Sequence, residues 1–205
     1  MSRDNFLLDS ISNNSIKLPL LRVYGWETPT ISFGANQSIN QSDQNHSNNF
    51  PTVKRVTGGQ AVLHGSPDNE LTYSVFIKYR YKVKQLYFEI GEILLAFLET
   101  FSLKGEFGYS SNNYSKDFDC FNSKTEADIV VNDVKVIGSA QYRKKEYVLQ
   151  HGSIKLDIIR RLSGKNIDFE HAKVNLKKAF QDKLKIDFTD YALANSLDTL
   201  YGSNN

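Results

Sequence analysis

The side chains with the clearest chemical potential lie in four short segments. Cys120 is the only cysteine, and it stands in the polar run 119–122, Asp-Cys-Phe-Asn. A structural cysteine more often lies in an apolar run, so this setting favours a reactive thiol. In a second segment, 135–141, Lys135 lies on a predicted strand, and the small residues Gly-Ser-Ala follow it.

The other two segments combine glycines with histidines. Segment 55–64 begins with Arg55 at the end of a predicted strand and continues into a Thr-Gly-Gly run. Glycines at this point let a ligand or another backbone approach closely, although an ordinary turn beside an arginine gives the same pattern. Segment 149–154 places His151 and a glycine among apolar strand residues. Both segments are more specific than packing alone requires.

The elements that must position these side chains follow from hydrophobic patterning. β-branched and aromatic residues predict strands over 20–26, 30–34, 52–56, 61–64, 71–77 and 147–154. A tight glycine turn is expected between strands 52–56 and 61–64. Residues 128–137 predict a hairpin that turns at Asn132 and Asp133.

Helical periodicity is found in three places. Apolar residues at spacings of three and four predict a long helix over 83–101. After Asp157 the sequence also changes to helical periodicity, which runs through 169–180 and again through 191–200. Strands followed by helices predict an α+β domain with a mixed sheet.

Length and charge set the domain organisation and exclude some partners. No Pro-, Gly- or Ser-rich stretch divides the 205 residues, so a single domain over 1–205 is expected. The nearly all-polar run 40–49 predicts a surface loop. A net charge of +2 is too small to favour nucleic acid or a membrane as a partner.

Composition also disfavours several kinds of site and location. The single cysteine excludes an intramolecular disulfide and zinc sites with two thiolates, and it favours the cytoplasm. The four histidines are spaced unlike a metal cluster, and the common nucleotide-binding glycine motifs are missing, so neither metal nor cofactor is expected. The N-terminus lacks the apolar core of a signal peptide, and the apolar run 90–98 is too short to span a membrane.

Together the four segments resemble the lipoate–protein ligase superfamily, the lipoyl- and octanoyl-transferring relatives of biotin protein ligase. The superfamily's opening motif is similar to residues 22–37. Its glycine motif, an arginine followed by Thr/Ser-Gly-Gly and Ala-Val-x-His, is matched by 55–64. Its lysine motif is matched by 135–141 and its Leu-Gln-His-Gly-Ser strand by 149–153. The resemblance covers about 20–157.

This resemblance implies the α+β fold of the biotin/lipoate-protein ligase catalytic domain, a mixed sheet flanked by helices that is related to the class II aminoacyl-tRNA synthetase core. Within the superfamily, the Glu-Leu-Thr-Tyr-Ser run at 70–74 and the cysteine ahead of the lysine strand are similar to the cysteine-dependent octanoyltransferases. Cys120 stands where their nucleophile stands. The implied activity moves an octanoyl group from octanoyl-acyl carrier protein to a lysine of a lipoyl-domain protein, without ATP.

The resemblance also implies roles for individual residues. Cys120 forms a thioester acyl-enzyme, and Lys135 stabilises its thiolate and the developing oxyanion. Either neutral Lys135 or His151 accepts the proton of the incoming lysine. The residues expected to form the acyl and substrate pocket are Arg55, Gly58, Gly59, Ala61, His64, Tyr73, Gly138, Ser139, Ala140, His151 and Gly152.

Three alternatives stay open alongside the octanoyltransferase. They are an ATP-dependent lipoate/octanoate–protein ligase, an octanoyl amidotransferase acting between lipoyl domains, and a non-catalytic module that binds lipoyl domains. The acceptor implied by the resemblance is the glycine cleavage H protein or a 2-oxoacid dehydrogenase E2. The chain departs from the octanoyltransferase motif at several positions, since Gln60 replaces Arg or Gly, and Lys124 and Asp128 replace Pro and Glu.

Overall fold

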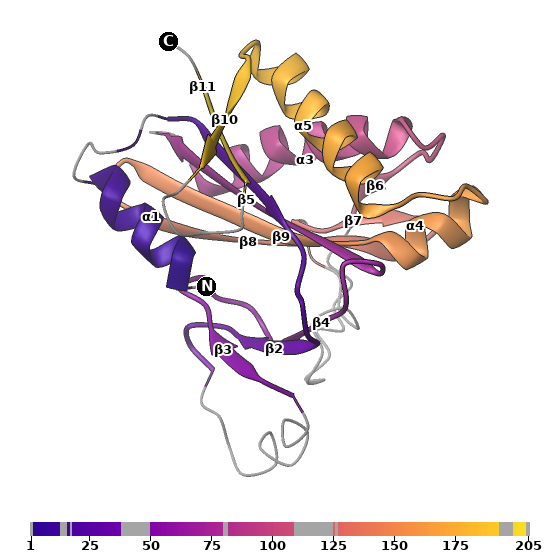
Figure 1. The fold of residues 1–205 in the computed structure, drawn as a ribbon, viewed down its shortest axis with the longest axis horizontal. Helices are drawn as coiled ribbons and strands as arrows, with labels where there is room; N and C mark the ends of the chain where they lie inside the picture. Colours follow the sequence, from indigo (N-terminus) through magenta and orange to yellow (C-terminus); the bar gives the residue numbers. More distant parts are fainter. Residues whose placement is uncertain are drawn as a thin grey trace.

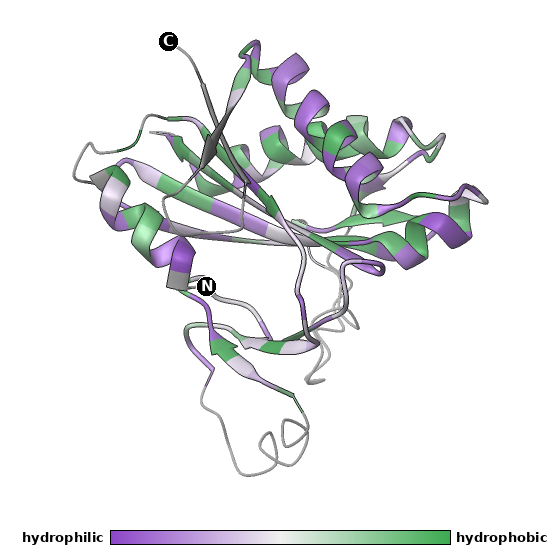
Figure 2. Cartoon of the chain, viewed as in Figure 1, coloured by the Kyte–Doolittle hydropathy of each residue, from purple (hydrophilic) through white to green (hydrophobic). Residues whose placement is uncertain are grey.

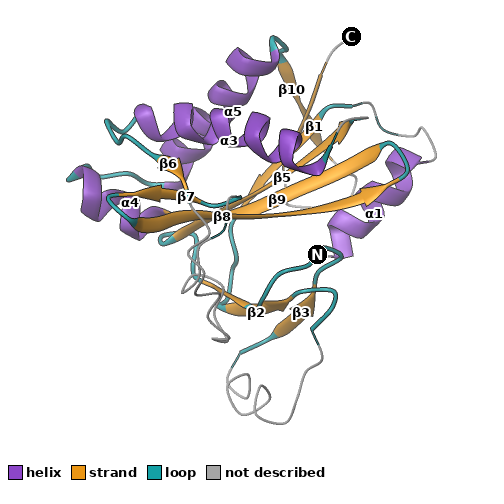
Figure 3. Ribbon diagram, turned by 180° about the vertical axis from the view of Figure 1, so that it is seen from behind, coloured by secondary structure: helices purple, strands orange, loops and turns teal. Residues whose placement is uncertain are grey.

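The computed structural model describes residues 2–12, 16, 18–37, 50–79, 82–108, 125, 127–192 and 199–203. A large sheet carries helices on one face, and a three-stranded sheet and the N-terminal helix lie at the other face (Figures 1 and 3). Within the described residues, no helix is both long enough and apolar enough to cross a membrane. The α+β class predicted from the sequence is confirmed.

Eight strands form the large sheet, in the order β10-β11-β1-β5-β9-β8-β7-β6. Every neighbouring pair in this sheet is antiparallel. The strands are β1 (Leu20–Tyr24), β5 (Glu70–Lys78), β6 (Glu106–Phe107), β7 (Ile129–Val131), β8 (Val134–Lys144), β9 (Tyr147–Lys155), β10 (Phe188–Ala192) and β11 (Thr199–Ser203).

The small sheet provides the mixed pairing. It has the order β3-β2-β4, with β2 (Thr30–Phe33) parallel to β3 (Thr52–Lys54) and antiparallel to β4 (Val62–His64). The tight turn expected between β3 and β4 is therefore wrong. Because β2 lies between the two strands, the Thr-Gly-Gly run must cross the width of a strand, and it forms an open loop.

Four helices are described: α1 (Ser2–Ser12), α3 (Val83–Glu99), α4 (Leu156–Ser163) and α5 (Phe169–Leu184). The predicted apolar face of α3 is buried, and it packs with residues of α4, α5 and the sheet in one core. Figure 2 shows that these helices carry hydrophobic and hydrophilic residues together, as amphipathic helices do. Asp168 caps α5 by accepting a 2.7 Å hydrogen bond from the backbone N–H of His171.

One predicted helix is wrong and one observed helix was not predicted. Residues 188–192 and 199–203 form β10 and β11, which extend the sheet beyond β1, so Tyr191 and Leu200 are on strands; Leu193 and Leu197 lie outside the described residues. Pairing with the edge of the sheet overrides the local periodicity there. The unpredicted helix is α1, whose Leu7, Leu8 and Ile11 pack against Phe76 and Leu149 in a second core.

The turn between β7 and β8 follows the prediction. Asn132 and Asp133 have φ angles of 49° and 64°, the left-handed backbone that a two-residue hairpin turn of this kind requires. Asparagine and aspartate tolerate these angles better than other non-glycine residues. The turn fixes the start of β8 and therefore the place of Lys135.

Successive side chains along the central strands point to opposite faces of the large sheet. Leu71, Tyr73 and Val75 of β5 pack in the helix-side core, whereas Phe76 packs against α1. Tyr73 lies in a cross-strand row with Gly152 and Ser139, and its hydroxyl shares a 2.9 Å hydrogen bond with Ser139 Oγ. The missing side chain at Gly152 makes room for this contact.

We predict that Gly152→Ala destabilises the fold by about 1–3 kcal/mol, because the core has no space for the added carbon. A Cβ there would lie 2.5 Å from the carbonyl oxygen of Gly138 and 2.7 Å from Cε1 of Tyr73. The matched control is Gly65→Ala, whose Cβ would meet nothing closer than 3.5 Å. Urea unfolding measures both variants, and equal stability of the two would contradict the prediction.

Candidate active site

A pocket of about 650 Å³, including space open to solvent, lies between the large sheet and the small sheet. It brings together residues from β2, β4, β5, β8 and β9 and from the loop after β3. The lining residues are Ser32, Arg55, Gly58, Gly59, Gln60, Val62, His64, Thr72, Thr125, Asp128, Lys135, Gly138, Ser139, Ala140, His151, Gly152 and Ser153.

Lys135 reaches the pocket because of an irregularity in the pairing of β7 with β8. Ile129 is opposite Ile137, whereas its neighbour Val130 is opposite Lys135, so β8 carries one extra residue, Val136. Both Val136 and Ile137 pack in the helix-side core. Because of this β-bulge, Val136 and Ile137 both pack in the core while Lys135 faces the pocket.

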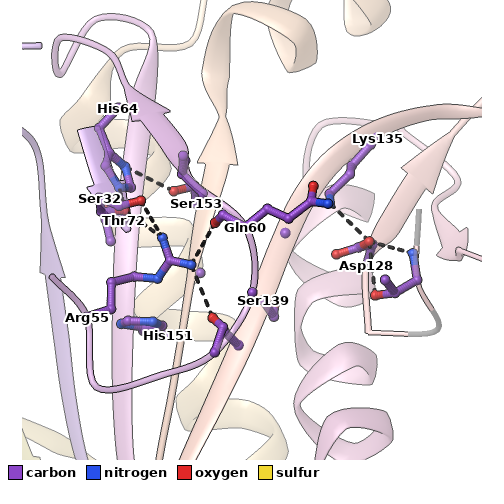
Figure 4. A pocket seen from close by; sticks show the side chains of 17 residues that line it. Ser32, Arg55, Gln60, His64, Thr72, Asp128, Lys135, Ser139, His151 and Ser153 are labelled. Atoms are coloured by element: carbon purple, nitrogen blue, oxygen red, sulfur yellow. Dashed lines mark hydrogen bonds and ion pairs between the residues drawn. The ribbon is translucent and has the colours of Figure 1, made fainter. Parts of the chain in front are cut away.

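Lys135 forms a buried ion pair with Asp128. Its Nζ lies 3.0 Å from Asp128 Oδ2, and the two side chains are only 5% and 4% exposed. Thr125 donates two more hydrogen bonds to the same oxygen, from its backbone N–H at 2.6 Å and from its Oγ1 at 3.1 Å. Figure 4 shows this pair at one side of the pocket. The arrangement holds a buried cation at the pocket wall.

Arg55 holds the glycine loop, which we define as residues 57–60, against the small sheet. Its Nη1 donates to the carbonyl oxygen of Ser32 at 2.7 Å and to Ser32 Oγ at 2.8 Å. Its Nη2 donates to the carbonyl oxygens of Gly58, at 3.1 Å, and Gln60, at 2.8 Å. Arg55 therefore shapes the pocket wall.

Close backbone packing keeps this loop in place. A Cβ on Gly34, in the segment after β2, would lie 1.9 Å from the carbonyl oxygen of Gly59, so only glycine fits at position 34. Gly59 itself has φ +95°, a backbone conformation that L side chains rarely adopt. At Gly58, by contrast, a Cβ would meet nothing within 4 Å.

His64 belongs to a buried chain of hydrogen bonds that ends on Arg55. Its Nδ1 lies 2.5 Å from Glu70 Oε1, and its Nε2 lies 2.7 Å from Ser32 Oγ. Burial lowers the pKa of His64 despite the opposing effect of Glu70, so the ring is neutral at pH 7. A carboxylate can only accept, so the proton is on Nδ1, and Nε2 accepts from the Ser32 hydroxyl. Trp26 stacks on the ring at 4.1 Å.

Glu70 is the charged end of this chain. It is fully buried and bonds His64, Ser153 Oγ at 2.8 Å and the amine of Lys155. Burial by itself would raise the pKa of Glu70, but the hydrogen bond to His64 and the charge of Lys155 lower it to about 2.

His151 secures the other side of the glycine loop. Its Nε2 lies 2.7 Å from Thr57 Oγ1, and its Nδ1 lies 3.5 Å from Asp4 Oδ2 of α1. Asp4 also accepts hydrogen bonds from Arg22 at 3.1 Å and Ser74 at 3.2 Å. Burial raises the pKa of Asp4, but His151 and the charge of Arg22 hold it below its ordinary value. Helix α1 thus contributes to the pocket through His151.

Most of the residues predicted from the sequence meet in this pocket. Ten of the residues named above line it: Arg55, Gly58, Gly59, His64, Lys135, Gly138, Ser139, Ala140, His151 and Gly152. Two do not. Ala61 packs with Ile31 and Phe33 in the small sheet, and Tyr73 packs in the helix-side core, where its hydroxyl hydrogen-bonds Ser139 Oγ. Cys120 and the loop 40–49 lie outside the described residues.

Other lining residues were not assigned to the site from the sequence. Ser32 lies on β2 in a strand pattern that gives no sign of its contact with Arg55. Asp128 was noticed only as a departure from a motif, although its place seven residues before Lys135, across a predicted hairpin, could have indicated a contact. Within the part of the chain that the structure describes, no group of three or more His, Cys, Asp or Glu side chains could hold a metal ion.

We predict that Glu70→Gln lowers the melting temperature at pH 7 by roughly 3–10 °C, because a buried hydrogen-bonded charge is lost. The pKa of Glu70 is lowered to about 2, so its ionised form stabilises the fold above about pH 4.5 and this contribution is lost as the pH falls toward 2. The melting curves of wild type and variant should therefore converge in acid. Glu170→Gln, at a side chain that is 70% exposed, is the control; a constant gap between wild type and Glu70→Gln from pH 7 to pH 2 would refute the assignment.

Comparison with known sequences places the chain in a family. Residues 1–182 match the family model described as the lipoyl protein ligase A/B catalytic domain. Proteins named Octanoyltransferase LipM are similar to it: that of Clostridioides difficile (strain 630) is 38% identical over 155 residues, covering 68% of this chain and 54% of the relative. Those of Macrococcus caseolyticus and Geobacillus kaustophilus are 30% and 32% identical, covering 89% and 95% of this chain and 71% and 72% of the relatives. The chain thus spans about half the length of the first of these relatives.

Solved structures agree on the fold. A bi-partite lipoate protein ligase from Thermoplasma acidophilum superposes with a TM-score of 0.67 at 16% identity, covering 91% of this chain and 80% of that one. LipL1 of P. falciparum, in complex with lipoate, gives a TM-score of 0.67 at 21% identity, covering 90% of this chain and 58% of that one. Since the family model matches residues 1–182 of 205, the chain belongs to the lipoyl protein ligase A/B catalytic domain family, as its four motifs predicted.

Proposed function

We propose that this protein is an N-octanoyltransferase that moves an octanoyl group from octanoyl-acyl carrier protein to a lysine of a lipoyl-domain protein. The observation that carries the proposal is the pocket between the sheets, where a buried lysine lies beside small residues that leave room for an acyl chain. The names of the similar Octanoyltransferase LipM proteins support the choice of acyl group.

The proposed reaction has two acyl transfers. The thiolate of Cys120 attacks the carbonyl carbon of the donor thioester, the carrier thiolate leaves, and the octanoyl group is held on Cys120 as a new thioester. The amine of the acceptor lysine then attacks this carbonyl, an amide forms, and the Cys120 thiolate leaves. Exchange of one thioester for another costs little free energy, so ATP is not needed.

Lys135 serves both steps in this proposal. Its ammonium stabilises the thiolate and donates a hydrogen bond to the oxyanion that develops on the carbonyl oxygen. Cys120 is five residues before Thr125 in the sequence. Thr125 and Lys135 both contact Asp128, which supports a role for Cys120 and Lys135 at one site.

The surroundings of His151 favour Lys135 as the proton acceptor for the incoming amine. The His151 Nε2 is engaged with Thr57, and its Nδ1 faces Asp4. Neutral Lys135, after it has given a proton to the departing carrier thiolate, would accept the proton of the acceptor lysine. Arg55 and His64 hold the pocket and take no chemical step.

The setting of the reaction belongs to the same proposal. The acceptor is the lipoyl domain of a glycine cleavage H protein or of a 2-oxoacid dehydrogenase E2, and the donor is octanoyl-acyl carrier protein. Because the nucleophile must remain a free thiol, the reaction takes place in the reducing cytoplasm. Residues 1–205 form one catalytic domain, with the polar run 40–49 as a loop, and no metal or cofactor takes part.

We predict that wild type incubated with octanoyl-acyl carrier protein alone gains one octanoyl group on Cys120. Because the bond is a thioester, neutral hydroxylamine should remove it, and addition of a lipoyl domain should discharge it. Intact-protein and peptide mass spectrometry measure both steps. Cys120→Ala should form no adduct. Full transfer by Cys120→Ala with free octanoate and ATP would instead show that the protein is an ATP-dependent ligase.

We predict that Lys135→Ala lowers the rate of transfer at least about 100-fold with the fold retained, since it removes the amine that assists the first step as an ammonium and accepts a proton in the second. The control is Lys144→Ala on the same strand, at a side chain that is 43% exposed, which should transfer normally. Transfer assays and circular dichroism are measured together. Near-normal transfer by a folded Lys135→Ala variant would remove this lysine from the mechanism.

A further inference from the structure

Asp128 connects three parts of the chain at the pocket wall. Its Oδ2 contacts Lys135 Nζ at 3.0 Å and accepts two hydrogen bonds from Thr125. Its backbone oxygen accepts a 2.8 Å hydrogen bond from the N–H of Gly108. Gly108 and Thr125 flank the segment that contains Cys120 in the sequence, so the chain enters and leaves this segment beside Asp128.

The approach of these two flanking residues is close enough to require glycine. A Cβ on Gly108 would lie 2.7 Å from the carbonyl oxygen of Thr125 and 3.5 Å from Cβ of Asp128. The backbone N–H of Asp128 also donates to the Thr125 carbonyl at 3.0 Å. The geometry around Asp128 is thus fixed by backbone as well as side-chain contacts.

Stability alone is a poor explanation for this ion pair. Taking two charges out of water costs about as much as their attraction returns, so a buried pair seldom adds net stability over apolar residues. Lys135 and Asp128 are both almost fully buried, and both line the pocket. The pair is better explained by its effect on the orientation of the Lys135 amine.

We propose that Asp128 is a positioning residue, which fixes the amine of Lys135 and the Thr125 end of the Cys120 segment on one carboxylate oxygen and so sets the geometry of acyl transfer. This inference rests on the proposed roles of Lys135 and Cys120. It assigns to Asp128 no contact with the reacting atoms. Loss of the carboxylate should therefore slow the acyl transfer step and leave donor binding unchanged.

The test is the single-turnover formation of octanoyl-enzyme at several concentrations of octanoyl-acyl carrier protein. Asp128→Asn keeps an oxygen that can accept from Thr125 but loses the charge that holds Lys135. We expect its maximal rate to fall about 10–100-fold, with half-saturation changed less than twofold. Asp128→Glu, which restores the charge, should recover part of the rate. Asp133→Asn, at an exposed turn residue of the same hairpin, should match wild type.

A milder variant covers the case in which Asp128→Asn does not fold. Thr125→Val removes only one of the three donors to Oδ2, and it should lower the maximal rate a few-fold without changing half-saturation. The proposal is overturned if the loss in these variants lies in half-saturation alone, or if Asp128→Asn transfers at the wild-type rate.

A double-mutant cycle in melting temperature tests the pair without any acyl substrate. Because Asp128 and Lys135 are in contact, the effects of Asp128→Asn and Lys135→Ala should be strongly non-additive. Additive effects would overturn the proposal. A wild-type protein that acylates nothing would refute the proposed transferase instead, and the melting cycle would still decide whether Asp128 holds Lys135.

Discussion

The pocket depends on the glycine loop being held to the small sheet on one side and to the large sheet on the other. On one side Arg55 bonds the loop carbonyls and Ser32, and on the other His151 bonds Thr57. These contacts are buried, and buried polar groups are costly unless they are paired. Since two separate networks must be satisfied together, the loop has little freedom, and the space beneath it keeps its shape.

Each network extends to a charge far away in the sequence. The first runs from Arg55 through Ser32 and His64 to Glu70, and the second from Thr57 through His151 to Asp4. Asp4 lies on α1 and Glu70 begins β5, so the N-terminal helix and the central strand both contribute to the pocket wall. The chemical pair, Lys135 with Asp128, lies on the opposite side of the pocket from Arg55 and His64, as Figure 4 shows.

The sequence could predict the elements whose signals are local. The turn at Asn132 and Asp133 and the apolar face of α3 are examples, because residue type and spacing decide both. The strands at 188–192 and 199–203 could not be predicted in this way, since β11 forms by pairing with β1, which is distant in the sequence, and β10 forms by pairing with β11. The open glycine loop has the same cause, as nothing in its own residues shows that β2 lies between β3 and β4.

The same distinction applies to the site. The four motifs predicted ten of the pocket residues, Lys135 among them. The contact of Lys135 with Asp128, however, depends on a β-bulge in β8 that no residue pattern indicates. Tyr73 was expected in the pocket because the run 70–74 that contains it resembles the octanoyltransferases. Strand alternation places its side chain on the other face of the sheet, where it packs in the helix-side core.

The most decisive measurement compares two acyl sources for one lipoyl-domain acceptor. In one reaction the protein receives octanoyl-acyl carrier protein without ATP, and in the other it receives free octanoate with ATP and Mg²⁺. Intact mass spectrometry of the acceptor reports the product. We expect one octanoyl group on the acceptor in the first reaction and none in the second. Acylation only in the second reaction would show that the protein is a ligase and not a transferase.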